Sequence, residues 1–557
     1  MRYKKLTIPT IGLTVILFLF HLVLKSAFAQ PVPSQNQSVR FTDVTAELGI
    51  EFQHVNGESG KKYFIEPIGS GVVLFDFDND GDLDLYLVNG SDLPGATSSI
   101  PPTNRLYRND GDAFTDITDD ASVGDTGYGL GCCVGDYNND GFTDLYVTNY
   151  GPNVLYRNNG DDTFTDVTAT AGVDGGQFSS GCAFVDVDAD GYLDLYVVNY
   201  VEFDPDTNPE CTRQGIRTYC TPEALPGAAD VFYRNNGDGT FTDVSKRIGI
   251  GTPGGKGLGV VCGDVDNDGD VDVFVANDTT PNFLYRNERN GVEMTEDALF
   301  AGVALSEEGR AYSGMGANLG DFDNDGYLDI VITNFQDQTN SLYRNEEIGF
   351  FTEMSFAKGI GERSLPYLAW GVDFIDFNND GWLDLFIANG HLDDNIAEID
   401  PIGTYPQPNQ LFLSDQGIRF SESTDAAVAQ RKVSRGTAFG DIDSDGDIDI
   451  VISNLKDAPT VLRNDGGNAS QWLTIRLIGT HCNRDAIGAR VTIVSEGLTQ
   501  MREVKSGSGY LSQNDLRLHF GLADATQVDT LTVRWLCGRV QTLQNVETNQ
   551  VLVISED

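Results

Sequence analysis

The sequence predicts an all-β protein: a seven-bladed β-propeller followed by a small β-rich domain. Three observations lead to this prediction. The acidic loop Asp-x-[Asp/Asn]-x-Asp-Gly-x-x-Asp occurs seven times, at spacings of roughly 50 to 80 residues. Short segments of alternating apolar and polar residues flank every loop, as expected for strands. The last part of the chain, 468–557, contains no copy of the loop, but it has four alternating segments that we expect to be strands: Trp472–Leu477, Ala489–Val494, Leu516–Phe520 and Thr530–Trp535.

Each repeat contains four strand-like segments. In the first repeat these are Gly71–Phe75, then Leu85–Asn89 after the acidic loop, then Leu106–Asn109, and finally a segment that begins at Phe114. Gly, Asn and Asp residues separate the segments and are typical of hairpin turns. The alternative is a linear array of calcium loops, but such arrays have closer loops and little strand between them. Repetition of a four-stranded unit therefore favours the propeller.

The two ends of the predicted propeller, 41–465, complement each other. Phe41–Thr45 has the sequence of a fourth strand but precedes any acidic loop, and the seventh repeat ends at Val461–Asn464 without such a segment. We therefore expect the N-terminal strand to complete the last blade, which would close the ring and leave no open sheet edge.

The acidic loop has the ligand pattern of a site for a hard divalent cation. In Asp76–Asp84, carboxylates occupy positions one, three, five and nine, and Gly81 at position six allows the chain to turn back. Position seven varies chemically between loops, which fits a backbone carbonyl ligand. Oxygen ligands alone favour Ca²⁺ over Mg²⁺ and Zn²⁺, and we expect up to seven Ca²⁺ ions. The predicted ligands are Asp76, Asp78, Asp80, Asp82 and Asp84; Asp136, Asn138, Asp140, Phe142 and Asp144; Asp186, Asp188, Asp190, Tyr192 and Asp194; Asp264, Asp266, Asp268, Asp270 and Asp272; Asp321, Asp323, Asp325, Tyr327 and Asp329; Asp376, Asn378, Asp380, Trp382 and Asp384; and Asp441, Asp443, Asp445, Asp447 and Asp449.

Two loops carry three carboxylates, rather than four, at positions one, three, five and nine. Asn138 and Asn378 stand at position three of loops two and six, so we expect these sites to bind calcium more weakly. Asn-Asp-Gly is also a good hairpin turn, but a bare turn does not account for four oxygen-bearing side chains in every loop. We expect the ions to brace the fold rather than to act as a switch.

The N-terminus has the three-part layout of a secretory signal, predicted at 1–29. Basic residues (Arg2, Lys4 and Lys5) precede an apolar run from Leu6 to Leu24, and Ala27-Phe28-Ala29 offers a cleavage site. A membrane anchor is the alternative, because the run is nearly long enough to span a bilayer. The prediction is an extracellular, secreted or periplasmic protein with no stable membrane span after cleavage.

The chain is strongly acidic, with a formal charge of −48 that becomes −52 when the four basic residues of the signal are removed. This charge excludes nucleic acid as a natural partner. Seven bound Ca²⁺ ions would add 14 positive charges and leave −38, so much of the acidity belongs to the predicted metal loops.

Disulfides are permitted in an exported chain. Cys211 and Cys220 bracket a short loop and are a candidate pair, and Cys482 and Cys537 are a second candidate pair near the C-terminus. The sequence does not decide whether the remaining cysteines form pairs or stay as buried thiols; these are Cys132, Cys133, Cys182 and Cys262.

The repeats resemble the FG-GAP/VCBS repeat of integrin α-subunit propellers. The tail motifs Asn483–Val491, Gly507–Gln513, His519–Leu522 and Val533–Trp535 resemble the ASPIC/UnbV domain that follows such a propeller in the cartilage acidic protein family. One departure is Trp535-Leu536-Cys537-Gly538, where the family usually has Trp-Pro-x-Gly. The resemblance implies extracellular calcium binding and a role in adhesion or matrix interaction.

Two long insertions are predicted on the face opposite the metal loops: Val201–Ala229 in blade three and Gly390–Asn409 in blade six. Long loops on a rigid scaffold often carry function, so we expect this face to bind an extracellular protein or glycan partner. The alternative is a propeller-fold lyase or dehydratase acting on carbohydrate, with His391 and Asp393 as acid–base groups. No catalytic constellation is recognised, and the sequence predicts a binding protein rather than an enzyme.

Overall fold

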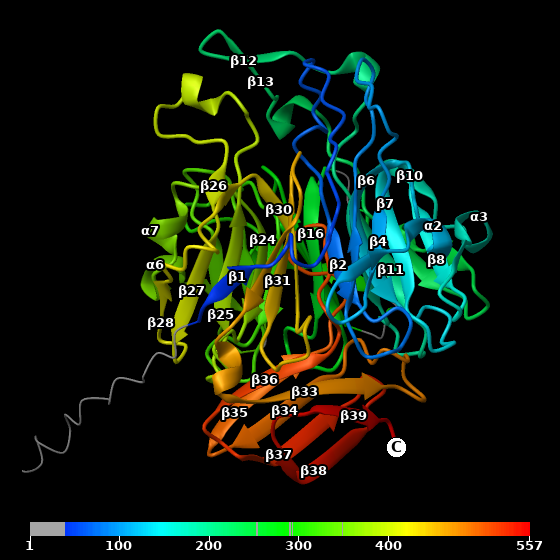
Figure 1. Cartoon of the computed structure of the whole chain (residues 1–557), viewed down its shortest axis with the longest axis vertical. Helices are drawn as coiled ribbons and strands as arrows, with labels where there is room; N and C mark the ends of the chain where they lie inside the picture. The colour runs from blue at the N-terminus through cyan, green and yellow to red at the C-terminus, as the bar shows by residue number, and fades with distance from the viewer. Residues whose placement is uncertain (1–38, 252–253, 289–290, 292, 348) are drawn as a thin grey trace, which may run out of the picture. The chain divides into compact units, whose positions relative to one another are not determined.

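The computed structural model describes residues 39–557, apart from 252–253, 289–290, 292 and 348. The predicted signal segment 1–29 lies outside the described residues. Residues 39–557 form one compact unit. Its larger part contains, among the described residues, seven groups of four antiparallel strands (Figure 1). The all-β fold is therefore confirmed, and the seven groups agree with the predicted blades.

The strands of each blade follow one another along the chain, except in the last blade. In chain order the blades are β2 (Val72–Phe75), β3 (Asp84–Leu87), β4 (Arg105–Asn109) and β5 (Phe114–Asp116); β6 (Tyr128–Gly135), β7 (Asp144–Pro152), β8 (Val154–Asn158) and β9 (Phe164–Asp166); β10 (Gly175–Val185), β11 (Asp194–Asn199), β14 (Val231–Asn235) and β15 (Phe241–Asp243); β16 (Gly257–Gly263), β17 (Asp272–Asn277), β18 (Phe283–Asn287) and β19 (Met294–Glu296); β20 (Ala317–Gly320), β21 (Asp329–Ile332), β22 (Ser341–Asn345) and β23 (Phe351–Glu353); β24 (Ala369–Ile375), β25 (Asp384–Asn389), β27 (Gln410–Asp415) and β28 (Arg419–Glu422); and β30 (Ser434–Gly440), β31 (Asp449–Asn454), β32 (Thr460–Asn464) and β1 (Phe41–Asp43).

The N-terminal strand closes the ring as predicted. β1 pairs antiparallel with β32, with Phe41 opposite Asn464. The first strands of successive blades contact one another, and β30 contacts β2. β10 also pairs with the end of β7, which joins blades two and three into one larger sheet.

A glycine stands in the first-strand segment of every blade, five residues before its acidic loop. A side chain at these positions would overlap the backbone or a side chain of a neighbouring blade or of the C-terminal segment. The absence of a Cβ therefore allows the first strands to approach closely around the central channel. The glycines are Gly71, Gly131, Gly181, Gly259, Gly316, Gly371 and Gly436.

The asparagine of the Leu-Tyr-Arg-Asn motif links neighbouring blades. Asn158 donates from Nδ2 to the carbonyl of Phe77, 2.8 Å away in the preceding blade. Asn464 makes the same bond to Phe377 at 2.8 Å. Blade six has Ser414 at this position. The pairs are Asn109–Ile442, Asn158–Phe77, Asn235–Tyr137, Asn287–Val187, Asn345–Val265 and Asn464–Phe377.

The Phe-Thr-Asp-Val-Thr motif ends in a one-turn helix that the sequence analysis did not predict. Asp116 accepts bonds from the backbone N–H and the hydroxyl of Thr118, at 3.0 and 2.6 Å. Thr118 in turn accepts the N–H of Leu106 at 2.9 Å, so this turn fastens the fourth strand to the third. The short helices are α2 (Thr118–Ala121), α3 (Thr168–Ala171), α4 (Ser245–Ile248), α5 (Ala298–Ala301), α6 (Ser355–Lys358) and α7 (Gly361–Ser364).

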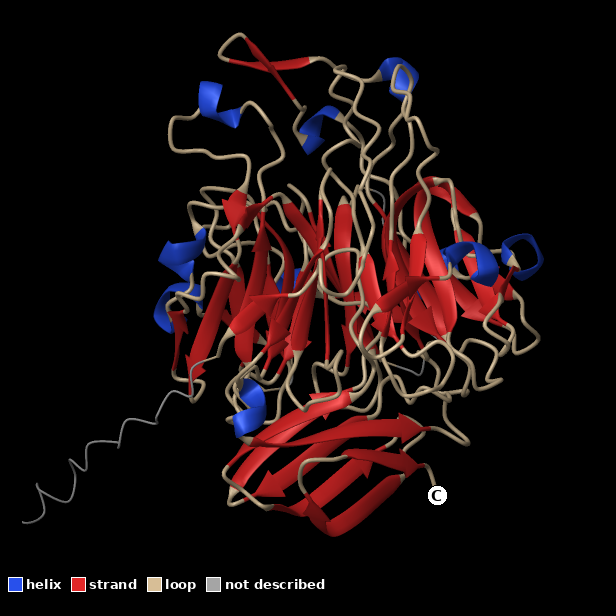
Figure 2. Cartoon of the chain, viewed as in Figure 1, coloured by secondary structure: helices blue, strands red, loops and turns tan. Residues whose placement is uncertain are grey.

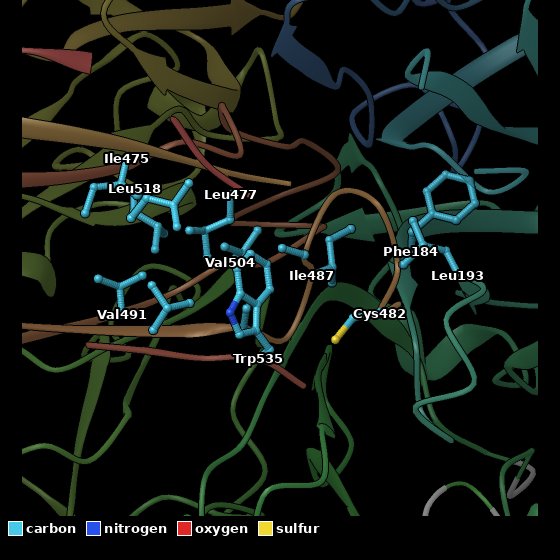
Figure 3. Packing of buried hydrophobic residues seen from close by; sticks show 14 of the residues in the cluster. Phe184, Leu193, Ile475, Leu477, Cys482, Ile487, Val491, Val504, Leu518 and Trp535 are labelled. Atoms are coloured by element: carbon cyan, nitrogen blue, oxygen red, sulfur yellow. The ribbon is translucent and has the colours of Figure 1, made fainter. Parts of the chain in front are cut away.

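The C-terminal residues form two further sheets (Figure 2), preceded by the turn η4 (Gly467–Ala469). One sheet has the order β36-β33-β39 and the other β35-β34-β37-β38. Their apolar faces, including Ile475, Val491 and Trp535, share one buried cluster with Phe184 and Leu193 of blade three (Figure 3). The two sheets therefore pack directly on the propeller. The strands are β33 (Gln471–Ile478), β34 (Arg490–Ser495), β35 (Leu498–Glu503), β36 (Leu518–Ala523), β37 (Gln527–Arg534), β38 (Val540–Glu547) and β39 (Val551–Ser555).

A loop of the C-terminal segment enters the central channel of the propeller. Gly509 and Ala317 exchange two backbone hydrogen bonds of 2.9 Å, and the carbonyl of Leu511 accepts the N–H of Cys132 at 3.2 Å. Gln513 forms a parallel bridge with Val73. The motif Gly507–Gln513 thus closes the channel from within.

The two insertions contain short elements of their own. The first forms the hairpin β12 (Cys211–Arg213) and β13 (Ile216–Thr218) between η1 (Pro205–Thr207) and η2 (Pro222–Ala224). The second contains η3 (Ile396–Glu398) and the strand β26 (Gln407–Pro408), which pairs with β29 (Arg431–Lys432). Figure 1 shows both insertions at the end of the ring opposite the C-terminal sheets. No helix in 39–557, outside the gaps named above, has the length and apolarity to cross a membrane.

Candidate functional site: the seven acidic loops and the cavity under the insertions

Each acidic loop joins the first two strands of its blade, and in loops one, three, four and five the carboxylates converge. In loop one, ligand oxygens of Asp76, Asp78 and Asp84 lie within 4.8 Å of one another. The same holds for Asp264, Asp266 and Asp272 in loop four. In loops three and five the clusters are formed by positions one, three and five: Asp186, Asp188 and Asp190, and Asp321, Asp323 and Asp325.

The arrangement fits a divalent cation. Asp76 Oδ1, Asp264 Oδ1 and Asp323 Oδ1 are buried and accept no hydrogen bond from the described residues. A buried carboxylate oxygen without a partner is costly, and an ion at the centre of the loop would compensate this cost. The donor set, carboxylates with backbone carbonyls, suits Ca²⁺.

The position-nine aspartates are deeply buried in all seven loops, at 2% exposure or less. Asp329 accepts the N–H of Phe322 at 3.1 Å on one oxygen and that of Asn345 at 2.8 Å on the other. These bonds tie the loop to the third strand of the blade. The position-nine aspartate therefore fixes the loop against the third strand, and its remaining lone pairs are available to an ion.

Burial raises the pKa of the loop carboxyls. Desolvation raises the pKa of Asp186 to about 6, that of Asp136 to about 7 and that of Asp376 to about 8. Burial likewise raises the pKa of Asp84 to about 8. These carboxylates are held in an environment that disfavours their charge, as expected for groups that share a bound cation.

Position four, for which the sequence analysis predicted no role, links five of the seven loops to the next loop through an asparagine. Asn79 donates to the carbonyl of Gly141 at 3.0 Å, and Asn379 donates to that of Gly446 at 2.9 Å. All seven position-four residues have φ between 52° and 63°, a conformation that asparagine tolerates well. The recurrence of Asn at this position was a signal for this role. The links are Asn79–Gly141, Asn139–Gly191, Asn267–Gly326, Asn324–Gly381 and Asn379–Gly446.

In four blades, the arginine of the Leu-Tyr-Arg-Asn motif pairs with the position-three aspartate of its own blade. Arg286 lies 2.8 Å from Asp266, and Arg344 lies 3.0 Å from Asp323. Blade six has lost both partners together, because Leu413 replaces the arginine and Asn378 replaces the aspartate. The arginine therefore balances the position-three charge. The same pairing occurs between Arg234 and Asp188 and between Arg463 and Asp443.

The C-terminal sheets dock on the face that carries the acidic loops, and the tail motifs make the contacts. Asp485 accepts the N–H of Asp136 at 2.6 Å. Arg534 lies 2.5 Å from Asp264, and His519 shares a hydrogen bond of 2.6 Å with Asn379. Further contacts are Arg476 with Asp76 and Asn483 with Asp186. Sequence reasoning identified these motifs but not their common role.

A cavity of about 600 Å³ lies under the insertions at the other end of the ring. His391 and Asp393 line it, as do the disulfide residues Cys211 and Cys220. His391 accepts the N–H of Asp393 on Nδ1 at 2.9 Å, and burial lowers its pKa to about 4. The histidine is therefore neutral and one of its nitrogens is already engaged.

Both candidate cysteine pairs form disulfides, with S–S distances of 2.05 Å for Cys211–Cys220 and 2.07 Å for Cys482–Cys537. The other four cysteines are buried free thiols. Burial raises the pKa of Cys132, Cys133 and Cys262, which makes these thiols unreactive.

Family comparisons match most of the chain. The model of the FG-GAP-like repeat family matches residues 76–147, 136–197, 224–275, 264–332 and 321–387. That of the ASPIC and UnbV family matches 479–557.

Cartilage acidic protein 1 of Xenopus tropicalis is 28% identical over 337 residues, 57% of this chain and 47% of the relative. The Mus musculus protein of the same name is 27% identical over 348 residues, 60% of this chain and 50% of the relative. The matches thus span about half the length of these relatives. A solved structure described as YCF48 bound to D1 peptide aligns with a TM-score of 0.40 and 8% identity, over 76% of this chain and 97% of that chain.

Proposed function

Because this chain belongs to the FG-GAP-like repeat family and ends in an ASPIC and UnbV domain, we propose that it is an exported calcium-binding propeller. It acts as an extracellular binding or adhesion module for a protein or glycan partner. Ca²⁺ in the acidic loops braces the blades, and the face built by the two insertions holds the partner.

The choice of the insertion face as the partner site rests on one observation. The C-terminal sheets cover the loop face and send Gly507–Gln513 into the channel. Among the described residues, the insertion face has no such cover and contains the cavity of about 600 Å³. Loops carried on a rigid ring, the first of them closed on itself by the Cys211–Cys220 disulfide, offer a preorganised binding surface.

The calcium part of the proposal is supported by the converging carboxylates and by their unpartnered buried oxygens. Each loop connects two strands of one blade, so an ion bound there adds to the stability of the folded ring. Loops two and six, with Asn138 and Asn378, are the sites expected to bind calcium most weakly.

The test uses the mature chain on an array of matrix proteins and glycans, with calcium and with chelator. In one variant, a short Gly-Ser linker replaces 203–226. The two ends of this deletion can be joined because Val201 and Gly227 already pair in a β-bridge. The control variant, Asp161→Ser with Asp162→Gly, changes a turn between β8 and β9. We expect the control to keep every partner and the linker variant to lose them. Retention of all partners by the linker variant would refute the proposed face.

A second candidate is a carbohydrate-active lyase or dehydratase, favoured only by the presence of His391 and Asp393 in the cavity wall. Incubation with acidic polysaccharides, followed by ultraviolet detection of unsaturated products, distinguishes the two functions. A binding protein yields no product from any polysaccharide.

A further inference from the structure

The cavity under the insertions combines an apolar wall with polar groups from separate elements. On the channel side it is closed by Ile68, Met315 and Trp370, which belong to the same buried cluster as Tyr510. On the outer side it is covered by the Cys211–Cys220 hairpin. Its volume of about 600 Å³ lies within the range of small-molecule sites.

The aromatic wall is held rigidly. The Trp370 ring lies 3.9 Å from the guanidinium carbon of Arg435 and 4.9 Å from the Tyr510 ring centroid. Phe64 stacks on Tyr200 with ring centroids 5.6 Å apart. Because neighbouring side chains fix these rings, little side-chain entropy is lost when a ligand packs against this wall.

Polar groups surround this wall, and each comes from a different part of the chain. Asp278 follows β17 and accepts the hydroxyl of Tyr200 at 2.6 Å. Asp393, in the blade-six insertion, accepts the N–H of Tyr219 at 3.0 Å. Ser313 and Gln338 line the cavity beside them. The acceptors are thus fixed in place and spread around the cavity.

This distribution selects among ligand classes. An anionic ligand would face Glu223, Asp278 and Asp393 with Arg213 as the only cationic side chain in the described lining. A purely apolar ligand would leave Asp278 Oδ1, which is buried and accepts no hydrogen bond from the described residues, without a donor, which is costly. A single ammonium group could satisfy one carboxylate but not acceptors on opposite elements. A hexose has apolar ring faces and hydroxyl donors around its edge, and it matches both features.

We propose that this cavity binds one hexose unit, either a free sugar or the terminal residue of a glycan. The proposal rests on the proposed function, since it places the ligand on the face assigned there to the partner. It adds the chemical class of the ligand and the groups that recognise it. Phe335 and Leu392, which are partly exposed in the cavity wall, contact a face of the ring beside the buried Trp370, and Asp278 accepts bonds from its hydroxyls.

The test titrates the mature, calcium-loaded chain with methyl hexosides: neutral, N-acetylated and acidic. Saturation-transfer NMR reports the bound sugar, and tryptophan fluorescence reports the change at Trp370. Asp278→Asn is expected to weaken binding about tenfold or more, because one charge-assisted bond is lost. A second arm with immobilised glycans distinguishes a free sugar from a terminal residue, and binding in either arm supports the proposal.

Asp230→Asn is the matched control. Asp230 resembles Asp278 in burial, at 6% against 5% exposure, and it also accepts a tyrosine hydroxyl, that of Tyr196 at 2.8 Å. Unlike Asp278, it does not line the cavity. The control should bind sugar as the parent does. The proposal is overturned if no hexose binds in either arm. It is also overturned if Asp278→Asn and Asp230→Asn both bind hexose as the parent does, or if both weaken hexose binding equally. If sugars fail while the linker variant still loses a protein partner, the proposed face stands and only the sugar assignment falls.

Discussion

Tyr510 of the C-terminal segment lies edge-on against Trp370 of blade six, with ring centroids 4.9 Å apart in the channel of the propeller. Both rings are buried, at 0% and 1% exposure. The contact joins residues 140 positions apart in sequence, and it places the C-terminal segment inside the ring. We therefore expect the propeller and the C-terminal sheets to unfold together.

Tyr510→Ala should destabilise the protein by about 3–5 kcal/mol, because it removes a fully buried ring. Tyr510→Phe is the control: the hydroxyl has no hydrogen-bond partner among the described residues, so its loss should cost less than about 1 kcal/mol. Urea denaturation followed at tryptophan and by circular dichroism measures both. Two separate transitions in the parent protein would contradict the coupled unfolding.

Removal of calcium should lower the melting temperature by more than about 10 °C. Ligands that bind only the folded state stabilise it by mass action, and several loops add their contributions. Calorimetry in excess EGTA and in millimolar calcium measures the difference. Equal melting temperatures would show that the acidic loops are only turns.

Asn378→Asp should raise the affinity of loop six for calcium by about tenfold, since it restores the position-three carboxylate. Trp382 occupies position seven of this loop, so terbium luminescence excited through tryptophan reports it. Trp382→Phe identifies the part of the signal that belongs to loop six. An unchanged terbium affinity would argue against a position-three ligand.

Arg344→Leu should raise the calcium affinity of loop five several-fold and destabilise the calcium-free protein. The guanidinium lies 3.0 Å from Asp323 and competes with the ion for that carboxylate. Hydrogen exchange of peptide 321–329, followed against calcium concentration, isolates this loop. The control is Arg157→Leu, whose guanidinium contacts Asn159 and not a position-three side chain. If both variants changed the calcium dependence of exchange equally, a specific competition between the arginine and the ion for the position-three carboxylate would be excluded.

The sequence predicted the features that depend on residues close together in the chain. The fixed spacing of Asp76 and Gly81 within a turn predicted the loop, and alternation predicted β33, β34, β36 and β37. The one-turn helix at Thr118 was missed, because four residues are too few to show a helical period. β38 was missed because it is largely exposed and lacks a clear apolar face.

Apart from the closure of the ring by β1 and the Cys482–Cys537 pair, contacts between distant residues could not be predicted from one sequence. Asn79 bonds to the next loop, and nothing within its own repeat shows this. Docking of Arg534 on Asp264 depends on how the C-terminal sheets fold before they meet the ring. The same applies to the entry of Gly507–Gln513 into the channel, because a Cβ at the channel glycine of five blades would overlap this loop.

His54 should make the protein less stable in acid. The ring is 3% exposed and accepts the N–H of Lys456 at 3.3 Å. Burial, with a smaller effect from the Arg435 cation, lowers its pKa from 6.5 to about 3. Between these values the unfolded chain binds a proton that the folded chain does not, so stability falls as pH falls from 6.5 towards 3.

His54→Gln removes this pH dependence. The free energy of unfolding of the parent, measured relative to that of the variant, should therefore fall by about 2 kcal/mol between pH 7.5 and pH 5. Urea denaturation of both proteins at saturating calcium, at each pH, measures the change, and titration of the loop carboxyls cancels in the comparison. A difference that stays constant with pH would mean that His54 carries the same charge in the folded and unfolded states.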